Sequence, residues 1–175
     1  MVYKLIQSVE VRSVIVMPCR TTALWMPAVV THLEFETPGG LKVTCVDTTP
    51  EVSQARLISA FNDTGAVIVN GTLETIPALP KAQMVVSWYG FQEWGVRGSW
   101  DFLGAIKQHG VDWVAFNNHG TATNGETPGG RKAINVRKAP YHLGAPARVV
   151  KGVSLAPDSD LSLVLYDTSN MREGM

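Results

Sequence analysis

The loop at residues 117–125, "NNHGTATNG", holds the residue types in this sequence that are best suited to catalysis. Histidine titrates near neutral pH, so His119 can act as a general base or bind a metal ion. Asp112 precedes the loop and Glu126 follows it, and either carboxylate could orient the imidazole ring. These residues define one hypothesis, a small hydrolase-type enzyme that uses His119 with Asp112 or Glu126.

Part of this loop resembles a known motif. Residues 118–123, "NHGTAT", resemble the His-Gly-Thr-Gly-Thr motif of the β-ketoacyl synthases, in which the histidine helps to decarboxylate or activate the extender unit. Such enzymes also need a nucleophilic cysteine in a turn of small residues and a second histidine further along. Cys19 lies in "MPCRT" and Cys45 in "VTCVD", and neither is such a turn. The resemblance is therefore local and predicts neither that fold nor that activity.

The other histidines and the cysteines predict no metal site and no cofactor. The spacings His-x-His and His-x-x-x-His do not occur, and His109 ends an expected helix, where a positive charge favours the helix dipole. The two cysteines make no disulfide framework and no Cys-x-x-Cys pair. We therefore expect Cys19 and Cys45 to be reduced, partly buried thiols.

A second group of residues is aromatic and glycine-rich, in "SWYGFQEWGVRGSWDF" at residues 87–102. Its rings could form a core cluster beneath a glycine-rich loop, a platform that stacks on sugars or bases, or the anchor of a subunit interface. Of the two functional alternatives we favour the interface, with Arg97 at its rim. The predicted interface or ligand-binding residues are Trp88, Tyr89, Phe91, Trp94, Arg97 and Trp100.

Charge is balanced overall, with 15 basic and 15 acidic residues, but it is uneven along the chain. Between Thr127 and Pro157 there is no acidic residue, whereas residues 21–80 carry an acidic excess. A basic stretch can bind the phosphates of a nucleic acid or an acidic surface on an identical subunit. Basic residues on several strands need not share a face, so a basic patch is a hypothesis. Its members would be Arg131, Lys132, Arg137, Lys138, Arg148 and Lys151.

The pattern of apolar residues along the chain predicts that strands and turns position most of these candidate residues. Alternating and β-branched apolar residues predict strands at 2–17, 24–36, 41–46, 66–75, 82–89, 111–116, 131–137, 147–155 and 161–166. Helices are expected near 50–61, after Thr49, and near 99–109, from Ser99 as N-cap to Gly110 as left-handed C-cap. The expected strands thus far outnumber the expected helices.

The pentapeptide Glu-Thr-Pro-Gly-Gly occurs twice, at residues 36–40 and 126–130. Proline followed by glycine suits a type II turn, so both copies predict hairpins, and the strand at 41–46 is expected to return antiparallel. The apolar residues after the two copies differ in parity by one position, which would turn opposite faces of the two strands to the core. We therefore infer a turn used twice and no duplicated domain.

Together these patterns predict a single β-rich domain over residues 1–175. Its 16 glycines, 10 prolines and many valines and threonines are typical of a turn-rich β protein, and 175 residues suffice for one core. We expect a mainly β fold, a β-sandwich or barrel of which a jelly roll is one form, with two short α-helices near 50–61 and 99–109.

The low charge content bears on function. Charged residues make up 17% of the chain, against about 25% in an ordinary soluble protein, so we expect a partner to cover part of the surface. We favour a non-enzymatic structural subunit of a homo-oligomeric assembly, such as a virus or phage particle protein of the capsid, decoration or tail type. The alternatives are the hydrolase based on His119 and a carbohydrate- or nucleic-acid-binding module based on the aromatic residues from Trp88 to Trp100.

The expected partners are copies of the same chain and other particle proteins, with nucleic acid as a weaker candidate. Lys4, Glu10 and Arg12 interrupt the N-terminal segment, so it forms no signal-peptide core, and no apolar run approaches the roughly 18 residues of a membrane span. We expect a soluble protein made in the cytoplasm, with the virion as its destination if it is a particle protein, and no membrane partner.

Overall fold

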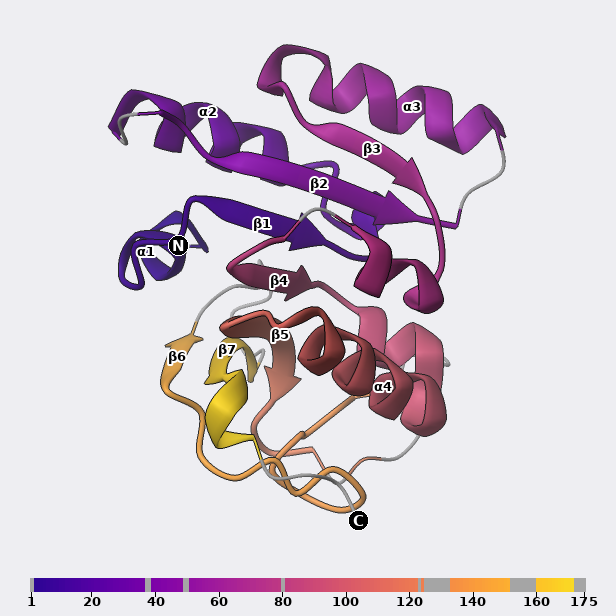
Figure 1. Ribbon diagram of the computed structural model, residues 1–175. Helices are drawn as coiled ribbons and strands as arrows, with labels where there is room; N and C mark the ends of the chain where they lie inside the picture. The colour runs from indigo at the N-terminus through magenta and orange to yellow at the C-terminus, as the bar shows by residue number, and fades with distance from the viewer. Residues whose placement is uncertain are drawn as a thin grey trace.

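A computed structural model describes residues 2–36, 39–48, 51–79, 81–122, 124, 133–151 and 160–171. Within these residues seven strands form one sheet, in the order β3-β2-β1-β4-β5-β7-β6 (Figure 1). The strands are β1 (Ser13–Val16), β2 (Lys42–Asp47), β3 (Val67–Asn70), β4 (Met84–Ser87), β5 (Trp113–His119), β6 (Arg148–Lys151) and β7 (Leu161–Asp167). The chain is thus an α/β protein, and the prediction of a mainly β sandwich or barrel is wrong.

Strands β1 to β5 run parallel to one another, whereas β7 runs antiparallel to both β5 and β6. Parallel neighbours cannot be joined by a tight hairpin, so the chain between them crosses the sheet, usually as a helix. The helices are α1 (Val2–Gln7), α2 (Met26–Glu36), α3 (Glu51–Phe61) and α4 (Gly90–His109), with short 3-10 turns η1 (Cys19–Thr21), η2 (Asn62–Thr64), η3 (Leu73–Ala78) and η4 (Thr168–Asn170). Among the described helices none is both long and apolar enough to cross a membrane.

Two cores lie on opposite faces of the sheet. Val14 and Val16 of β1 pack in the first core with Met26 of α2, while Ile15 packs in the second core with Phe102 of α4. Helices α1, α2 and α3 contribute to the first core, and α4, η3 and the segment 133–147 contribute to the second. Because both faces of the central strands are buried, β1 ("SVIV") and β4 ("MVVS") are nearly continuous apolar runs.

Several predicted strands are not strands. Residues 2–7 form α1 and residues 26–36 form α2, so only 13–16 of the predicted N-terminal strand is extended in the sheet. Residues 133–137 form no strand either. In Figure 1 the segment 133–147, in orange, continues as an irregular chain below α4. Local alternation therefore overestimated the strand content.

The first Glu-Thr-Pro-Gly-Gly copy, of which Thr37 and Pro38 lie outside the described residues, stands between a helix and a strand, so the predicted hairpin is wrong. Gly39 and Gly40 have φ values of 86° and 66°, in the left-handed region that glycine tolerates. They connect α2 to β2, which pairs parallel with β1 and not antiparallel as predicted. The second copy, at residues 126–130, lies outside the described residues.

Both helix predictions find a counterpart. The helix expected near 50–61 is α3, and the one expected at 99–109 is the C-terminal half of α4. Gly110 ends α4 as predicted, with φ of 77°, and its N–H donates to the carbonyl oxygens of Ile106 and Lys107. The cap was predictable because glycine alone adopts this conformation without strain.

The start of α4 differs from the prediction. The helix begins at Gly90, and Ser99 lies inside it, where its hydroxyl donates to the Gly95 carbonyl oxygen (2.6 Å). Gly95, with φ of 67° and ψ of −167°, breaks the helical path between the two halves. Glycine is a poor helix former, so the three glycines in this half hid it from the sequence pattern.

Cys19 and Cys45 form a disulfide, with Cα atoms 5.3 Å apart, and both side chains are fully buried. Cys19 follows β1 and Cys45 belongs to β2, whose register places it beside Val16. The bond therefore fastens the loop after β1 to the neighbouring strand. The prediction of reduced thiols is wrong, because the parallel pairing that brings the two cysteines together is not visible in the sequence.

Candidate functional site

The strand order reverses at β1 and β4. From β1 the chain builds β2 and β3 on one side, and then returns to place β4 on the other side of β1. In open α/β sheets ligands bind outside the carboxyl ends of the strands at such a switch point. Here we use the term switch point for residues 17–25 after β1, Asp47 at the end of β2, residues 87–92 from the end of β4, and Asn117 of β5.

Asp47 is the buried carboxylate of the switch point, with 2% of its surface exposed. It accepts a hydrogen bond from the Arg20 backbone N–H (2.6 Å) and pairs with the Arg20 guanidinium. In doubly wound folds that bind nucleotides, an acidic residue beyond the second strand hydrogen-bonds a ribose hydroxyl. Asp47 has the position and the charge for that contact, and Arg20 occupies both of its oxygens.

The Arg20 side chain also reaches α4, where its guanidinium pairs with Glu93. Burial raises the pKa of Glu93; the Arg20 charge lowers it and the Asp47 charge raises it, so that the net shift is upward from the ordinary value. Glu93 is thus protonated more easily than an ordinary glutamate. Its protonation would leave Arg20 paired with Asp47 alone.

Hydrogen bonds hold the loops after β1 and β4 together. The Thr21 hydroxyl lies 2.7 Å from the Pro18 carbonyl oxygen and 2.6 Å from that of Trp88. Residues 17–25, "MPCRTTALW", contain no glycine. Turns that bind a pyrophosphate use glycines so that the phosphates can approach the backbone. This loop therefore favours a ligand without a pyrophosphate group.

Buried polar atoms without partners gather near the ends of β4 and β5. Among the described residues, Ser87 Oγ, Asn117 Nδ2 and both amide atoms of Gln92 have no hydrogen-bond partner. Asn117 Oδ1 does accept a hydrogen bond, from the Tyr89 N–H (2.6 Å). Unpaired buried polar groups are rare and commonly face a water molecule or a ligand. The atoms present therefore fit a polar ligand bound at the switch point.

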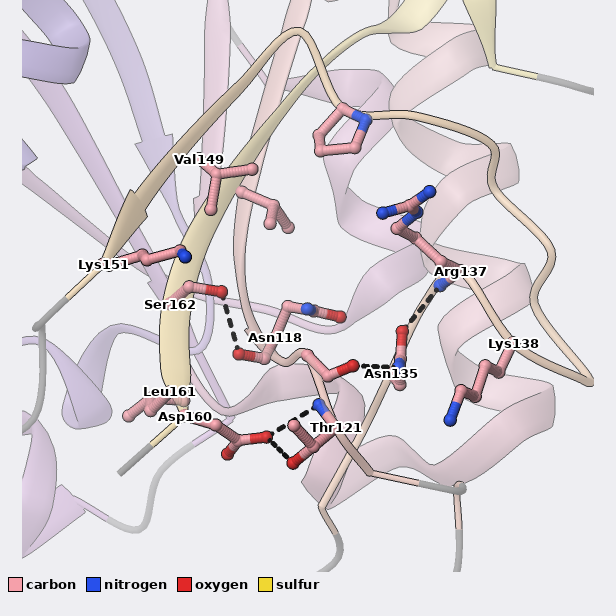
Figure 2. Close-up of a pocket in the computed structure, with 13 residues that line it drawn as sticks. Asn118, Thr121, Asn135, Arg137, Lys138, Val149, Lys151, Asp160, Leu161 and Ser162 are labelled. Atoms are coloured by element: carbon pink, nitrogen blue, oxygen red, sulfur yellow. Dashed lines mark hydrogen bonds between the residues drawn. The ribbon is translucent and has the colours of Figure 1, made fainter. Parts of the chain in front are cut away.

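A pocket of about 700 Å³ lies where β5 ends and β7 begins (Figure 2). Its lining includes the cations Arg137, Lys138 and Lys151, and the carboxylate of Asp160. We call it the basic pocket. It lies at the carboxyl edge of the sheet, because β5 and β6 end there and the antiparallel β7 begins there.

Asparagine side chains fasten the segment 133–147 beside the basic pocket. Asn118 Oδ1 accepts a hydrogen bond from the Val136 N–H (2.9 Å), and Asn135 Nδ2 donates to the Gly120 carbonyl oxygen (2.8 Å). Asn124 Nδ2 donates to the Asn135 carbonyl oxygen (2.8 Å). Each amide joins segments that are separated in sequence, so the segment 133–147 is held by specific hydrogen bonds although it contains no helix or strand.

Hydrogen bonds hold the Asp160 side chain in place at one end of the basic pocket. Its carboxylate accepts hydrogen bonds from the Thr121 N–H (2.8 Å) and the Thr121 hydroxyl. Burial acts to raise the pKa of Asp160, but these hydrogen bonds and the His119 charge outweigh burial, so the pKa lies below its ordinary value. Asp160 is therefore ionised at neutral pH.

The structure separates the predicted catalytic residues. His119 ends β5 and Asp112 precedes it, so the length of the strand puts them roughly 20 Å apart and Asp112 cannot orient the ring. Glu126 lies outside the described residues. A carboxylate that the sequence did not single out, Asp160, lies within the influence of the His119 charge, which lowers the pKa of Asp160. No group of three His, Cys, Asp or Glu side chains in the described part of the chain could hold a metal ion.

One nitrogen of the His119 ring already has a hydrogen-bond partner. Its Nδ1 accepts a hydrogen bond from the Ile134 N–H (3.4 Å). In the neutral ring the proton is then on Nε2, which can donate but cannot take up a second proton. This geometry favours a donor role for His119 over the predicted role as a general base.

Most of the predicted aromatic residues pack inside the protein. Trp88 belongs to the first core and Phe91 to the second, with 9% and 1% of their surfaces exposed. Trp94 and Trp100 are half-buried against the second core, whereas Arg97 is exposed. The rings therefore lie on both faces of the sheet and make no single stacking platform.

The predicted basic patch comes together in part. Three of its six residues meet in the basic pocket, whereas Arg148 lies on β6 outside the pocket lining. Arg131 and Lys132 lie outside the described residues. The sequence showed the excess of basic residues but not which of them share a cavity.

No protein-family model matches the chain, and no curated protein sequence does. Solved structures of methyltransferases do share its fold. The methyltransferase CalO6 superposes with a TM-score of 0.60 at 17% identity, over 92% of this chain and 60% of its own. The O-methyltransferase NcsB1 from neocarzinostatin biosynthesis, in complex with S-adenosylmethionine and 2-hydroxy-5-methyl naphthoic acid, gives 0.59 at 17% identity, over 89% and 49%. The bifunctional kinase-methyltransferase WbdD gives 0.60 at 14% identity, over 94% and 36%.

At these identities the likeness shows a common fold, a mixed seven-stranded sheet with helices on both faces. The chain spans 36% to 60% of the length of these structures. The prediction of a non-enzymatic subunit of a virus or phage particle, which depended on composition and low charge, is wrong, because the solved structures that share the fold are of another kind. The three proteins compared above are methyltransferases, which are enzymes.

Proposed function

We propose that this chain is an enzyme that binds S-adenosylmethionine at the switch point and transfers its methyl group to an acceptor. The observation that carries the proposal is the strand order β3-β2-β1-β4-β5-β7-β6, with β7 antiparallel, together with the buried carboxylate of Asp47 at the end of β2. The likeness to methyltransferases, one of them solved with S-adenosylmethionine, supports it.

Residues of the switch point would hold the cofactor. Asp47 would accept hydrogen bonds from the ribose hydroxyls, and Ser87 Oγ and Asn117 Nδ2 are buried polar atoms open to further contacts. The glycine-free loop at 17–25 is compatible with S-adenosylmethionine, because that molecule contains no phosphate. When bound, it supplies a methyl group made electrophilic by the positively charged sulfur.

Positioning is the main contribution that the protein would make to the reaction. Methyl transfer requires the acceptor atom to approach in line with the bond that breaks, and a fixed geometry lowers the entropic part of the barrier. The ends of β4 and β5 lie side by side, since Ser87 is in register with Phe116. Asn117 faces the switch point and Asn118 lines the basic pocket, so both sites adjoin the end of β5.

The Arg20 guanidinium must release Asp47 Oδ1 before a ribose hydroxyl can bind that oxygen, whereas the Arg20 backbone N–H can remain on Oδ2. The guanidinium already pairs with Glu93 as well as with Asp47, so rotation toward Glu93 would keep the cation paired. The ribose hydroxyls would replace the hydrogen bonds that Asp47 loses. Cofactor binding is therefore coupled to a movement of Arg20.

Isothermal titration calorimetry with S-adenosylmethionine and S-adenosylhomocysteine tests the proposal. The native chain is expected to bind both, and Asp47→Asn to weaken binding about tenfold or more, because the charge-assisted hydrogen bonds to the ribose are lost. Asp63→Asn is the matched control, since Asp63 is an exposed aspartate of η2 away from the switch point, and should bind like the native chain.

Folding must be checked separately, because Asp47→Asn also removes the pair with Arg20. Circular dichroism and urea unfolding of each variant show whether the fold survives. Arg20→Ala leaves the Asp47 charge in place without its competing cation and is expected to keep or tighten binding. The proposal fails if the native chain binds neither compound, or if folded Asp47→Asn binds as well as the native chain.

A further inference from the structure

We propose that the basic pocket binds the acid group, a carboxylate or a phosphate, of a small-molecule ligand, and that this ligand is the methyl acceptor. The identification of the ligand as the acceptor rests on the proposed function, whereas the binding of the acid group does not. The observation behind it is the convergence of three cationic side chains on one concave site.

The cations reach the pocket from two segments. Lys151 ends β6, and Arg137 and Lys138 belong to the segment 133–147; Figure 2 shows Lys151 on one side and the other two on the opposite side. None of the three forms an ion pair with a carboxylate of the described residues. A concave site lined by one sign of charge concentrates ions of the opposite sign, so the arrangement favours an anion.

Asp160 sets the orientation of the ligand. Its ionised carboxylate lies at one end of the pocket, where it accepts a hydrogen bond from the Thr121 N–H (Figure 2). It repels an acid group from that end, while Arg137 and Lys151 attract it further away. The acid group therefore binds between these cations, and an uncharged, hydrogen-bonding part of the ligand faces Asp160 and the end of β5.

The size and the apolar lining of the pocket limit the ligand class. About 700 Å³ falls within the roughly 300–1,000 Å³ of small-molecule sites. Val149, Val164 and Pro146 add apolar surface to the lining. A compact molecule with an apolar body and one acid group matches this combination. A single-stranded nucleic acid instead binds along an extended basic groove with aromatic platforms.

The place of the pocket suits an acceptor. Asn118 lines it, and the preceding residue, Asn117, contacts Tyr89 at the switch point. Successive side chains of a strand point to opposite faces, so the end of β5 separates the two sites by little more than the strand itself. A ligand anchored by its acid group in the pocket can extend over this strand end toward the switch point.

Calorimetric titration with benzoate, phenyl phosphate and the neutral benzyl alcohol tests the inference. At least one of the two acids is expected to bind, and benzyl alcohol to bind about tenfold more weakly or not at all, because it lacks the charge that the three cations recognise. The tighter of the two acids identifies the acid group as a carboxylate or a phosphate.

Variants locate the site. Arg137→Gln and Lys151→Gln are each expected to weaken binding of the acid about tenfold. Arg148→Gln is the matched control, because Arg148 is an exposed cation on the same strand as Lys151 but outside the pocket lining, and should leave binding unchanged. All three side chains are exposed, and thermal unfolding of each variant confirms that the fold is kept.

Three outcomes would overturn the inference. The first is that neither acid binds better than benzyl alcohol. The second is that Arg148→Gln weakens acid binding as much as Lys151→Gln does. The third is that a short single-stranded oligonucleotide binds with a steep salt dependence while neither acid binds. Titration of the same variants with S-adenosylmethionine keeps the two proposals apart. If the acids bind and S-adenosylmethionine does not, the proposed acid site in the basic pocket stands and the methyltransferase proposal fails. If S-adenosylmethionine binds and the acids do not, the methyltransferase proposal stands and the acid site fails.

Discussion

Gly90, the first residue of α4, allows that helix to pack closely against the end of β4. A Cβ atom on Gly90 would touch Ser87 Oγ and lie 2.6 Å from the Trp94 ring. Ser87 is the last residue of β4, and Trp94 lies in the first half of α4. Glycine is therefore required at position 90 because a side chain would clash with these neighbours, and not because the backbone there has a positive φ.

We expect Gly90→Ala to lower the free energy of unfolding by about 1–3 kcal/mol, because the added methyl group overpacks this turn. Gly104→Ala is the matched control in the same helix, where a Cβ atom would meet nothing within 4 Å. It should raise stability by about 0.5–1 kcal/mol through the better helix propensity of alanine. Urea unfolding of both variants measures the difference, and equal stabilities would contradict the packing described here.

The residues that matter most at the switch point carried no local mark in the sequence. Asp47 was one of several acidic residues in an acidic region, and Arg20 stood near a cysteine without a recognisable pattern. Their pairing joins the loop after β1 to the end of β2. His119 was a candidate from the sequence, whereas Asp160, whose pKa the His119 charge lowers, lies 41 residues further along the chain and was not.

At the scale of elements, the disulfide links the loop after β1 to β2. Cys19 and Cys45 are 26 residues apart in sequence, and the chain between them contains α2. A cross-link of this kind restricts the unfolded chain, and the restriction grows with the length of the closed loop. The disulfide therefore stabilises the half of the sheet that carries Asp47.

We expect the double variant Cys19→Ala, Cys45→Ala to lose about 3–4 kcal/mol of unfolding free energy, as the loop-closure relation gives for this separation. Urea unfolding measures the loss. The native chain with excess dithiothreitol is the control and should unfold near the midpoint of the double variant. A native chain that shows two reactive thiols under denaturing, non-reducing conditions would contradict the disulfide.

At the scale of the whole molecule, Tyr166 joins the sheet to the segment 133–147. It lies on β7, and its hydroxyl donates to the Gly144 carbonyl oxygen (3.2 Å). Burial raises the pKa of Tyr166 to about 12, although the Arg137 charge acts to lower it. In the unfolded chain the same group ionises near its ordinary value of 10.0.

This pKa shift predicts how stability depends on alkaline pH. Between pH 10 and about 12 the unfolded chain releases the Tyr166 proton while the native chain keeps it, so stability falls as pH rises, by about 2 kcal/mol in total. Tyr166→Phe should be less stable than the native chain at neutral pH but should lose less on going to pH 12. Urea unfolding across this range measures the slopes, and parallel curves for the two proteins would contradict the prediction.

The whole fold also places the residues on which the functional hypotheses depended. The aromatic residues from Trp88 to Trp100 divide between the two cores, while the basic residues Arg137, Lys138 and Lys151 gather in one pocket. Association with copies of the same chain stays a prediction from the low charge content.

The sequence by itself determined the features that depend on neighbouring residues. The helix near 50–61, the glycine cap at Gly110, the approximate places of β3 to β7 and the basic stretch were all predicted, because propensity, capping and charge are local properties. Only the tertiary structure decided that the strands run parallel, that Cys19 meets Cys45, that Arg20 covers Asp47, and that Lys151 faces Arg137 across a pocket. Each of these contacts joins residues far apart in the chain, and the buried strands of a parallel sheet have no alternation that would show which neighbours they take.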